Sequence, residues 1–570
     1  MRVYTVEQMR TLERRADEAG HSYDAMMERA GGAVAEAVAS WAPVAVAAGN
    51  GKEKARVLVL AGPGNNGGDG LVAGRELARR GFSVAAYLWK RDADEPRAAE
   101  ARQAGVSIVR AEGDREWQML RRALSRADIV LDALLGTGAS RPIEGDLAAI
   151  LAQLAEVRRP ATAGNEGLTW VQRHRQGGET RQRRLVAVDL PSGVNADAGQ
   201  VDPAAVPADL TVTLAGPKLG MLLAPAADTL GELVVADIGI PAAVAEQLEA
   251  AADFLDPATA ARLMPQRPAS GHKGTFGKVM IVGGSANYVG APGLAAEGAG
   301  RGGAGLVTLA VPGLIAPTLA AKSELTSMTW FVLPHDLGAL TPDALKVLRE
   351  KLPGYDALAL GMGVGQEEVT QRFIHGLLGL KAAGEHGRAA IGFVRARSDR
   401  EEGEEQLVLP ATVLDADGLN ALAAAEAEWW MHLPPQRLVL TPHPGEMSRL
   451  TGRETADIQR HRLDVAREQA EIWGQVVVLK GAHSVIAAPD GRATFSPFAT
   501  ATLATAGTGD VLAGVIAGLL AQGLEPYDAA RFGVYLHGLA GALMADTMPV
   551  ALSSDLPGFL TDAWALLAGA

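Results

Sequence analysis

The fold class follows first from a stretch near the amino terminus, Val57-Leu-Val-Leu-Ala-Gly-Pro-Gly-Asn-Asn-Gly-Gly-Asp69. Its apolar start predicts a buried strand, and its glycines predict a turn into a helix. A second glycine-aspartate loop, Ala506-Gly-Thr-Gly-Asp510, opens a segment with helical periodicity. Unpaired N–H groups and the positive end of the helix dipole converge at such helix entrances. Both loops are therefore predicted to hold anions such as phosphate at equivalent strand-to-helix junctions.

Around both loops, short β-branched runs alternate with longer segments rich in Ala, Leu and Arg. The runs are 57–60, 84–89, 129–132, 186–190, 279–282, 306–310, 357–361, 438–441 and 476–480. This alternation predicts parallel sheets with helices on both faces. We expect two α/β domains, 1–245 and 250–570, joined by a proline-containing connector at 241–270.

Composition limits the partners and the compartment. The net charge of -13 repels polyanions, and 5% aromatic residues provide few stacking platforms, so we expect local phosphate binding and no nucleic-acid partner. The absence of cysteine excludes thiolate metal sites and a cysteine nucleophile. The amino terminus lacks the apolar core of a signal peptide, and the apolar run 511–521 is too short to span a bilayer. We therefore expect a cytoplasmic protein without a membrane partner.

Two stretches have no apolar periodicity. One is the Gly- and Arg-rich segment 161–184, and the other is 382–405, which ends in an acidic run. Both are predicted to be solvated loops that directly precede a strand.

Polar residues follow several predicted strands of the first half. They are Asn65, Asn66 and Asp69 in the glycine loop, and the polar residues of three segments that end strands, Asp132-Ala-Leu-Leu-Gly-Thr-Gly138, Asp189-Leu-Pro-Ser-Gly193 and Ala215-Gly-Pro-Lys218. Ligands of open parallel sheets bind beyond the carboxyl ends of the strands, so we expect these residues to converge. Oxygen donors with few carboxylates favour a hard monovalent cation, and potassium is the candidate. The alternative is that Asp132 and Asp189 only cap the helices that follow.

These motifs, with the segment ending Met27-Glu-Arg-Ala-Gly31, resemble the epimerase domain of the NAD(P)H-hydrate repair enzymes over most of residues 1–240. The expected fold is a Rossmann-like three-layer α/β domain. By this resemblance Asp189 is the acid-base residue, and Asn66, Asp132 and Ser192 bind potassium. The residues implied to hold the substrate are Asn65, Asn66, Gly67, Gly68, Asp69, Gly136, Thr137, Gly138, Ala139, Ser140, Arg141 and Pro142.

The second loop is suited to phosphoryl transfer. Its backbone amides would stabilise the moving phosphoryl group, and Asp510 would take the proton of the acceptor hydroxyl. The alternative for Asp510 is a helix N-cap. Lys480 and His443 also follow predicted strands, although either residue alone is explained by a snorkelling side chain or a turn. Magnesium carried by the nucleotide is the expected metal here.

Together with His272-Lys-Gly-Thr-Phe-Gly277, Tyr288-Val-Gly-Ala291 and Gly361-Met-Gly-Val-Gly365, these motifs resemble the dehydratase domain of the same repair system over about residues 254–570. That domain is a ribokinase-like α/β domain. Met362 stands where the family has proline. The resemblance implies that Ala291, Gly363, His443 and Asp510 face the hydrated dinucleotide. The residues implied to contact the adenine nucleotide are Lys480, Gly481, Ala482, His483, Ser484 and Gly509.

The two activities belong to one repair process. Phosphorylating the ring hydroxyl of hydrated NADH or NADPH makes it a good leaving group, and the ring nitrogen can then expel it. A chiral site accepts one epimer, so an epimerase is needed for the other. We expect a bifunctional isomerase and lyase that uses ADP or ATP and associates as a homo-oligomer through its amino-terminal helices. The alternative is a vitamin or sugar kinase with a non-catalytic N-terminal binding domain.

Overall fold

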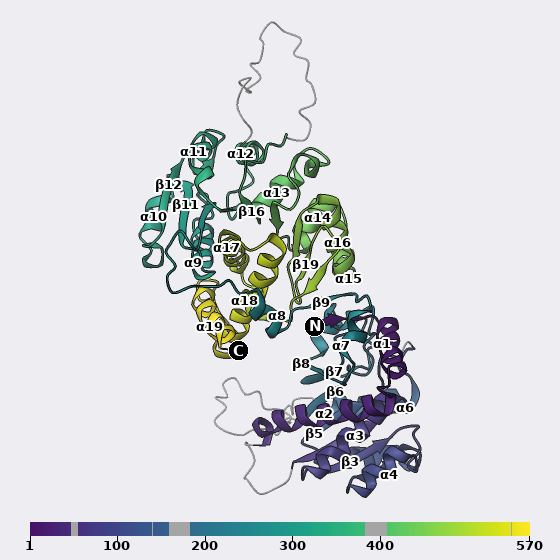
Figure 1. Ribbon diagram of the computed structural model, residues 1–570. Coiled ribbons are helices and arrows are strands. Elements are labelled where there is room, and N and C mark those ends of the chain that lie inside the picture. Colours follow the sequence, from purple (N-terminus) through teal and green to yellow (C-terminus); the bar gives the residue numbers. More distant parts are fainter. Residues whose placement is uncertain (47–54, 139–140, 159–182, 382–406, 549, 570) are drawn as a thin grey trace, which may run out of the picture. The chain divides into compact units, whose positions relative to one another are not determined.

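The computed structural model describes residues 1–46, 55–138, 141–158, 183–381, 407–548 and 550–569 (Figure 1). Contacts divide the chain into an N-terminal unit, Arg2–Ala251, and a C-terminal unit, Ala252–Ala570 with Met1. The expected solvated loops lie outside the described residues, except for Arg183 and Arg184. None of the described helices has the length and apolar character that crossing a membrane requires.

The N-terminal unit contains a parallel sheet, as the sequence predicts. Its strands run in the spatial order β4 (Ser107–Arg110), β3 (Ser83–Leu88), β2 (Arg56–Ala61), β5 (Ile129–Ala133), β6 (Arg184–Val188), β7 (Leu210–Leu214) and β8 (Glu232–Ala236). Every neighbouring pair in this order is parallel. The carboxyl ends of β2, β5, β6 and β7 therefore meet along one edge, where the polar motifs of the first half follow them.

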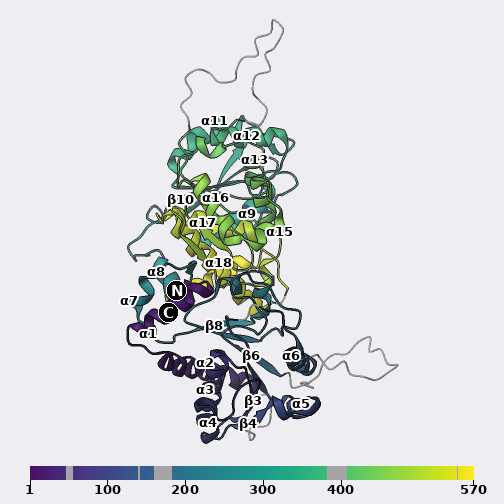
Figure 2. The ribbon, with the colours of Figure 1, turned by 90° about the vertical axis from the view of Figure 1, so that its right-hand side faces the viewer.

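Helices cover both faces of this sheet. Val57 and Val59 of β2 belong to a core shared with α2 and α3, whereas Leu58 and Leu60 pack with α5 and α6. Figure 2 shows α2 and α3 on one side of the sheet and α5 and α6 on the other. The predicted three-layer α/β architecture is confirmed. The helices of the unit are α1 (Val6–Glu18), α2 (Tyr23–Val46), α3 (Asn65–Arg79), α4 (Pro96–Gln103), α5 (Gln118–Arg126), α6 (Gly145–Arg158) and α7 (Ala242–Glu246).

The sheet of the C-terminal unit is mixed. Its strands run in the order β9 (Ala252–Phe254), β20 (Ala493–Phe495), β19 (Val485–Ala487), β18 (Val476–Leu479), β17 (Leu438–Leu440), β16 (Ala411–Leu414), β15 (Ala357–Leu360), β10 (Lys278–Val282), β11 (Leu306–Pro312) and β12 (Thr329–Leu333). From β18 to β12 all pairs are parallel, as predicted, but β19 is antiparallel to both its neighbours. The expected connector 241–270 contributes β9, which pairs with β20 and is thereby part of the sheet.

The helix that follows the second loop lies in the core of the C-terminal unit. It is α17 (Thr508–Ala521), which packs against α9 (Ala291–Arg301) and α18 (Pro526–Thr547). The backbones touch: a Cβ on Gly514 would lie 1.9 Å from the carbonyl oxygen of Ala295. The helix is buried all round, not on one face. The other helices are α8 (Pro257–Leu263), α10 (Ala316–Ala320), α11 (Ala344–Lys351), α12 (Glu368–Leu378), α13 (Asp417–Ala423), α14 (Pro444–Thr451), α15 (Thr455–Arg460), α16 (Arg462–Trp473) and α19 (Leu556–Ala568).

The two glycine-aspartate loops are not equivalent junctions, contrary to the prediction. The first joins β2 directly to α3, but a 3-10 turn, Ala501–Leu503, precedes the second. The strand β20 ends at Phe495, and residues 496–507 separate it from α17. Their shared features are local: both helices begin after a glycine without a side-chain cap, which leaves the first N–H groups free of side-chain partners.

Candidate functional site

The first glycine loop is closed by its own backbone and by Arg91. Arg91 Nη1 donates to the carbonyl oxygens of Gly62 and Gly64, each at 2.8 Å. A Cβ on Gly67 would lie 2.0 Å from the oxygen of Gly62, so only glycine fits there. Asn65 is exposed, whereas the four predicted residues after it are buried: Asn66, Gly67, Gly68 and Asp69.

Three residues predicted as cation ligands lie together at the carboxyl ends of β2, β5 and β6. Asp132 is 1% exposed, and its carboxylate accepts hydrogen bonds from Ser192 Oγ at 2.6 Å and from the Ser192 amide at 2.8 Å. Asn66 Nδ2 donates to the carbonyl oxygen of Leu135 at 2.8 Å. The Leu135 amide in turn donates to Ser192 Oγ at 2.9 Å. The hydrogen bonds to the Asp132 carboxylate do not come from the first turn of a helix, so the capping alternative for Asp132 is wrong.

This cluster contains oxygen atoms that fit a cation. Asn66 Oδ1 is buried, and no hydrogen-bond partner for it is found in the part of the chain that the structure describes. Burial raises the pKa of Asp132, although the hydrogen bonds from Ser192 and Leu134 oppose the shift. A buried carbonyl oxygen without a donor and a buried carboxylate would both be stabilised by a positive ion. One carboxylate with neutral oxygens favours a monovalent ion over a divalent one.

Asp189 is paired with a lysine that the sequence analysis gave no role. Asp189 lies beyond β6 with a φ of 69°, and its Oδ1 contacts Lys218 Nζ. The same oxygen accepts from the Leu214 amide at 3.1 Å and from Thr213 Oγ1 at 3.2 Å. Lys218 is 1% exposed. All these partners belong to β7 or follow it, so Asp189 does not cap a helix.

Two further carboxyl groups lie within range of the charges of this pair. Burial, followed by the negative charges of Asp189 and Glu13, raises the pKa of Asp69 well above its ordinary value. Burial also raises the pKa of Glu13 from α1, and the Lys218 charge opposes that shift. The raised pKa favours the protonated form of the Asp69 carboxyl group.

The loop after β5 lies beside the same cluster. A Cβ on Gly136 would be 3.1 Å from the Cβ of Asn66, and one on Gly138 would be 3.8 Å from Nη2 of Arg10. Thr137 is half-buried, and Arg141 and Pro142 are exposed. Ala139 and Ser140 lie outside the described residues.

In the C-terminal unit, Lys480 lies among carboxylates. Its Nζ is 2.6 Å from Asp415 Oδ1 and 3.7 Å from Glu446 Oε2. Burial lowers the pKa of Lys480, but Asp415 and Glu446 outweigh burial and raise it. A Cβ on Gly509 would lie 3.4 Å from the same Nζ. The loops after β16, β17 and β18 therefore converge on the amino-terminal turn of α17, as predicted.

Asp510 occupies the third position of α17, and Gly507 is the N-cap, so the capping alternative for Asp510 is wrong. No hydrogen bond to its carboxylate is found among the described residues. Burial, followed by the charge of Asp415, raises the pKa of Asp510 to about 7, and Lys480 opposes the shift. A carboxylate with such a pKa can take up a proton and release it at neutral pH.

His443 caps α14. Its Nδ1 accepts from the amides of Gly445 at 3.0 Å and Glu446 at 3.3 Å. Burial lowers the pKa of His443 and outweighs the opposing effect of Glu446, so the ring is neutral. The turn alternative is thus correct for Nδ1, while the half-exposed ring still borders the Lys480 cluster.

Two of the residues predicted to face the dinucleotide, Gly363 and Ala291, lie side by side. Gly363 has a φ of 66°, and a Cβ there would be 3.0 Å from the Cβ of Ala291 and 2.6 Å from that of Tyr288. Asp417 anchors this loop, because its carboxylate accepts from the Gly365 amide at 3.0 Å. The Asp417 charge also raises the pKa of Asp510, which connects the Gly363 loop to the α17 entrance.

Side chains of Arg462 and His483 support the predicted nucleotide loop 480–484. Arg462 Nη2 donates to the carbonyl oxygens of Leu479 at 2.9 Å and Lys480 at 3.2 Å. His483 is 5% exposed, and its Nδ1 lies 3.0 Å from the oxygen of Ser496, so it supports the loop. Gly481 and Ala482 are exposed, and Ser484 Oγ closes the turn onto the oxygen of Gly481 at 2.9 Å.

Sequence reasoning missed several charged members of these clusters. Asp415 directly follows β16, Glu446 lies in the segment after β17 and Lys218 lies in the segment after β7, so their position after a strand was an available signal. Glu13 lies on an amphipathic helix, where nothing local marks it.

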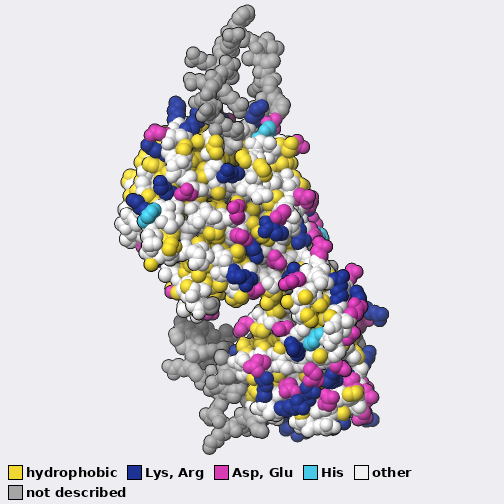
Figure 3. Space-filling model, in the orientation of Figure 1, with side chains coloured by type: hydrophobic (Ala, Val, Ile, Leu, Met, Phe, Trp, Pro, Cys, Tyr) yellow, Lys and Arg dark blue, Asp and Glu magenta, His cyan; other side chains and the backbone are white. Residues whose placement is uncertain are grey.

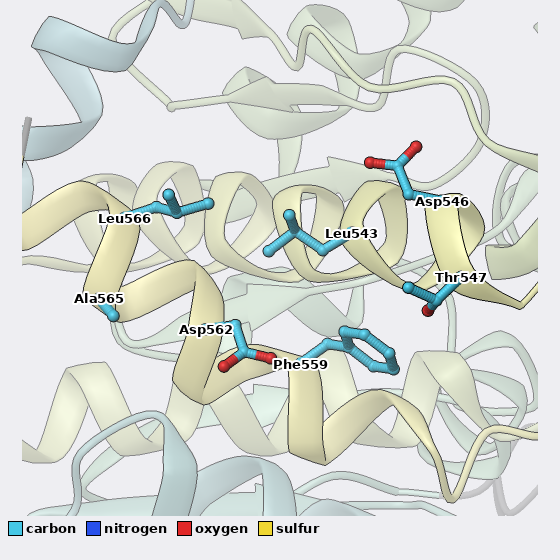
Figure 4. A pocket seen from close by; sticks show the side chains of 7 residues that line it. All are labelled: Leu543, Asp546, Thr547, Phe559, Asp562, Ala565 and Leu566. Atoms are coloured by element: carbon cyan, nitrogen blue, oxygen red, sulfur yellow. The ribbon is translucent and has the colours of Figure 1, made fainter.

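A separate groove lies between α18 and α19 (Figure 4). It is lined by Leu543, Asp546, Thr547, Phe559, Asp562, Ala565 and Leu566. None of the predicted site residues is among them. Figure 3 shows acidic and basic side chains interspersed on the visible face of each unit, which agrees with phosphate binding at local sites only.

Two family models match the chain. The one described as YjeF-related protein N-terminus matches residues 23–220, and the one described as NAD(P)H-hydrate dehydratase matches residues 279–558. The bifunctional NAD(P)H-hydrate repair enzyme Nnr of Moorella thermoacetica is 39% identical over 85% of this chain and 82% of its own length. That of Thermofilum pendens is 36% identical over 96% of this chain and 92% of its own.

Among solved structures, the ADP/ATP-dependent NAD(P)H-hydrate dehydratase of Bacillus subtilis, co-crystallised with ATP and Mg²⁺, is 27% identical. It matches 55% of this chain and 99% of its own with a TM-score of 0.43. The family rests on the sequence relatives, whose similarity extends over both units. By that similarity, the chain belongs to the family of bifunctional NAD(P)H-hydrate repair enzymes.

Proposed function

We propose that this chain repairs hydrated NADH and NADPH: the N-terminal unit interconverts the R and S hydrates, and the C-terminal unit dehydrates the S form with phosphate from ADP or ATP. The observation that carries the proposal is the 39% identity to a bifunctional repair enzyme over 85% of the chain. The two polar clusters support it, since each unit has one at the carboxyl ends of its strands. A vitamin or sugar kinase would not need the first cluster.

In the N-terminal unit, the amides at the start of α3 and the loop 136–142 hold the dinucleotide. Asp189 takes a proton from the hydrate and returns it after inversion. Asn66, Asp132 and Ser192 would hold potassium, whose positive charge would offset the buried Asp132 carboxylate and organise the substrate loops. The partnerless Asn66 Oδ1 supports this assignment.

In the C-terminal unit, the amides at the start of α17 bind the transferred phosphoryl group. Asp510 takes the proton of the ring hydroxyl while the hydroxyl oxygen bonds to phosphorus. The bond from phosphorus to the nucleotide breaks at the same time. The ring nitrogen then expels phosphate, and loss of a proton from the neighbouring ring carbon restores the reduced nicotinamide. Magnesium bound to the nucleotide would neutralise part of the charge of its phosphates. Lys480 and the loop 481–484 contact the nucleotide, and Ala291, Gly363 and His443 face the hydrate.

The oligomeric state and compartment belong to the same proposal. We expect a cytoplasmic homo-oligomer in which amphipathic helices at the amino terminus take part in association.

The test uses the purified full chain with mixed R and S hydrates. We expect the reduced cofactor to reappear completely with ADP or ATP, and the epimerase step to be faster with potassium than with sodium. Pure R hydrate separates the two activities, because it is repaired only if the N-terminal unit is active. Failure to regenerate reduced cofactor from the S hydrate, with either nucleotide, would contradict the dehydratase assignment.

A further inference from the structure

The Lys218 ammonium has no hydrogen left for a ligand. It donates to Asp189 Oδ1, to Thr213 Oγ1 at 2.9 Å and to the carbonyl oxygen of Leu214 at 3.0 Å. An ammonium carries three donors, and here each has a protein acceptor. Because the side chain is also 1% exposed, Lys218 is not placed to contact a substrate directly. Any effect on a reaction must act through Asp189.

The hydrogen bonds to Asp189 are one-sided. Lys218, Thr213 and the Leu214 amide all donate to Oδ1. Among the described residues, no hydrogen bond reaches Oδ2. The side chain of Asp189 is 11% exposed, so its carboxylate is not sealed in the core. One oxygen is thus anchored and the other is left for a proton.

Stability alone does not explain the ion pair of Lys218 and Asp189. Apolar side chains of similar volume often replace a buried ion pair without loss, because desolvation cancels much of the attraction. The backbone of Asp189 is in the left-handed region, which a non-glycine residue adopts at a cost. A paired, strained residue at the strand ends, close enough to Asp69 and Glu13 to shift their pKa values, points to a functional role.

We propose that Lys218 is a positioning residue of the epimerase reaction: it anchors Oδ1 of Asp189 and leaves Oδ2 as the oxygen that exchanges a proton with the hydrate. The inference rests on the proposed epimerase function. The hydroxyl proton passes to Oδ2 as the bond between the hydroxyl-bearing carbon and the ring nitrogen breaks and the nitrogen keeps the electron pair. Ring closure on the other face of that carbon returns the proton, so no further reactant is needed. The ammonium has two effects, since it fixes the carboxylate and opposes the raised pKa values of Asp69 and Glu13.

The test measures R-to-S conversion in the full chain carrying Lys218→Met. We expect kcat to fall about 100-fold at pH 7, with KM for the hydrate little changed. The loss should shrink as the pH is raised, because without the ammonium the carboxyl groups of Asp69 and Glu13, whose pKa values it lowers, ionise only at higher pH. Lys218→Arg, which keeps the charge, should recover part of kcat. Lys90→Met, at an exposed lysine of the same unit, is the matched control and should not change kcat.

Folding is checked in the same molecules through their dehydratase activity on S hydrate and their thermal melting. If Lys218→Met does not fold, Thr213→Val carries the test; it removes one hydrogen bond to Oδ1 and retains the ammonium, so a roughly 5-fold loss that is equal at every pH is expected, and wild-type kcat in this variant overturns the inference. Wild-type kcat in the Met variant, or a loss equal at every pH that Arg does not recover, overturns the inference. If the wild-type chain does not interconvert the hydrates at all, the proposed function fails instead.

Discussion

Each unit places a lysine against an aspartate at the carboxyl ends of its strands, but the partner differs. In the N-terminal unit Lys218 binds Asp189, the proposed acid-base residue itself. In the C-terminal unit Lys480 binds Asp415 at 2.6 Å, and Asp510 has no hydrogen bond among the described residues. The first arrangement orients the reactive carboxylate. In the second arrangement the charge of Lys480 lowers the pKa of Asp510, a carboxylate that Lys480 does not bind. Predictions that separate these two roles test the comparison.

The largest expected effect comes from removing the base of the C-terminal unit. Asp510→Asn cannot take the hydroxyl proton, so we expect dehydration of S hydrate to fall about 1000-fold while epimerisation is unchanged. Recovery of reduced-cofactor absorbance measures the first activity and separation of the hydrates the second. Asp490→Asn, at an exposed aspartate paired with Arg492, is the control. A parallel loss of both activities would mean that the units do not act independently.

A smaller effect is expected for Lys480→Met. The charge of Lys480 lowers the pKa of Asp510, which burial and Asp415 raise. Without that charge the pKa of Asp510 rises further, so we expect about 10- to 100-fold less dehydratase activity at pH 7 and a partial recovery at higher pH. A pH–rate profile of the variant measures this. An unshifted profile would show that Lys480 acts only by binding nucleotide.

The wild-type pH dependence should also distinguish the units. Since the pKa of Asp510 is about 7, the dehydratase rate is expected to rise roughly 10-fold between pH 6 and pH 8. The folded-state pKa lies above the ordinary value of 3.8, so the stabilisation linked to this group is present below that value and is lost as the pH rises through about 7. Asp510→Asn should remove the part of this loss that falls between pH 5 and pH 8, about 2 to 3 kcal/mol, in paired thermal melts at these two pH values.

The smallest effect is expected at the predicted dinucleotide face. An added methyl in Gly363→Ala meets Tyr288 and Ala291, and the residue has a positive φ. We expect KM for S hydrate to rise roughly 5-fold and KM for the nucleotide to stay unchanged. Gly300→Ala on α9, where the nearest atom to a Cβ is a methionine methyl 3.6 Å away, serves as control. Equal changes in both KM values would place Gly363 outside the hydrate face.

Much of the fold could be predicted from local patterns. The β-branched runs lie within two residues of observed strands in the first half, and α17 begins two residues after Ala506. Period-two and period-3.6 patterns are properties of neighbouring residues, so a single chain reveals them. The antiparallel strand β19 and the pairing of β9 with β20 were not predicted, because both depend on hydrogen bonds between segments far apart in sequence.

The same division applies to the sites. The sequence by itself determined which strand ends carry carboxylates, amides and glycines, and from those motifs the two halves of the family resemblance. Only the tertiary structure decided that Lys218 holds Asp189, that Asp415 holds Lys480, and that Asp510 is left with a raised pKa. The physical reason is that a lysine can neutralise whichever carboxylate the fold brings within a few ångströms, and parallel strands bring together residues separated by tens of positions in the chain.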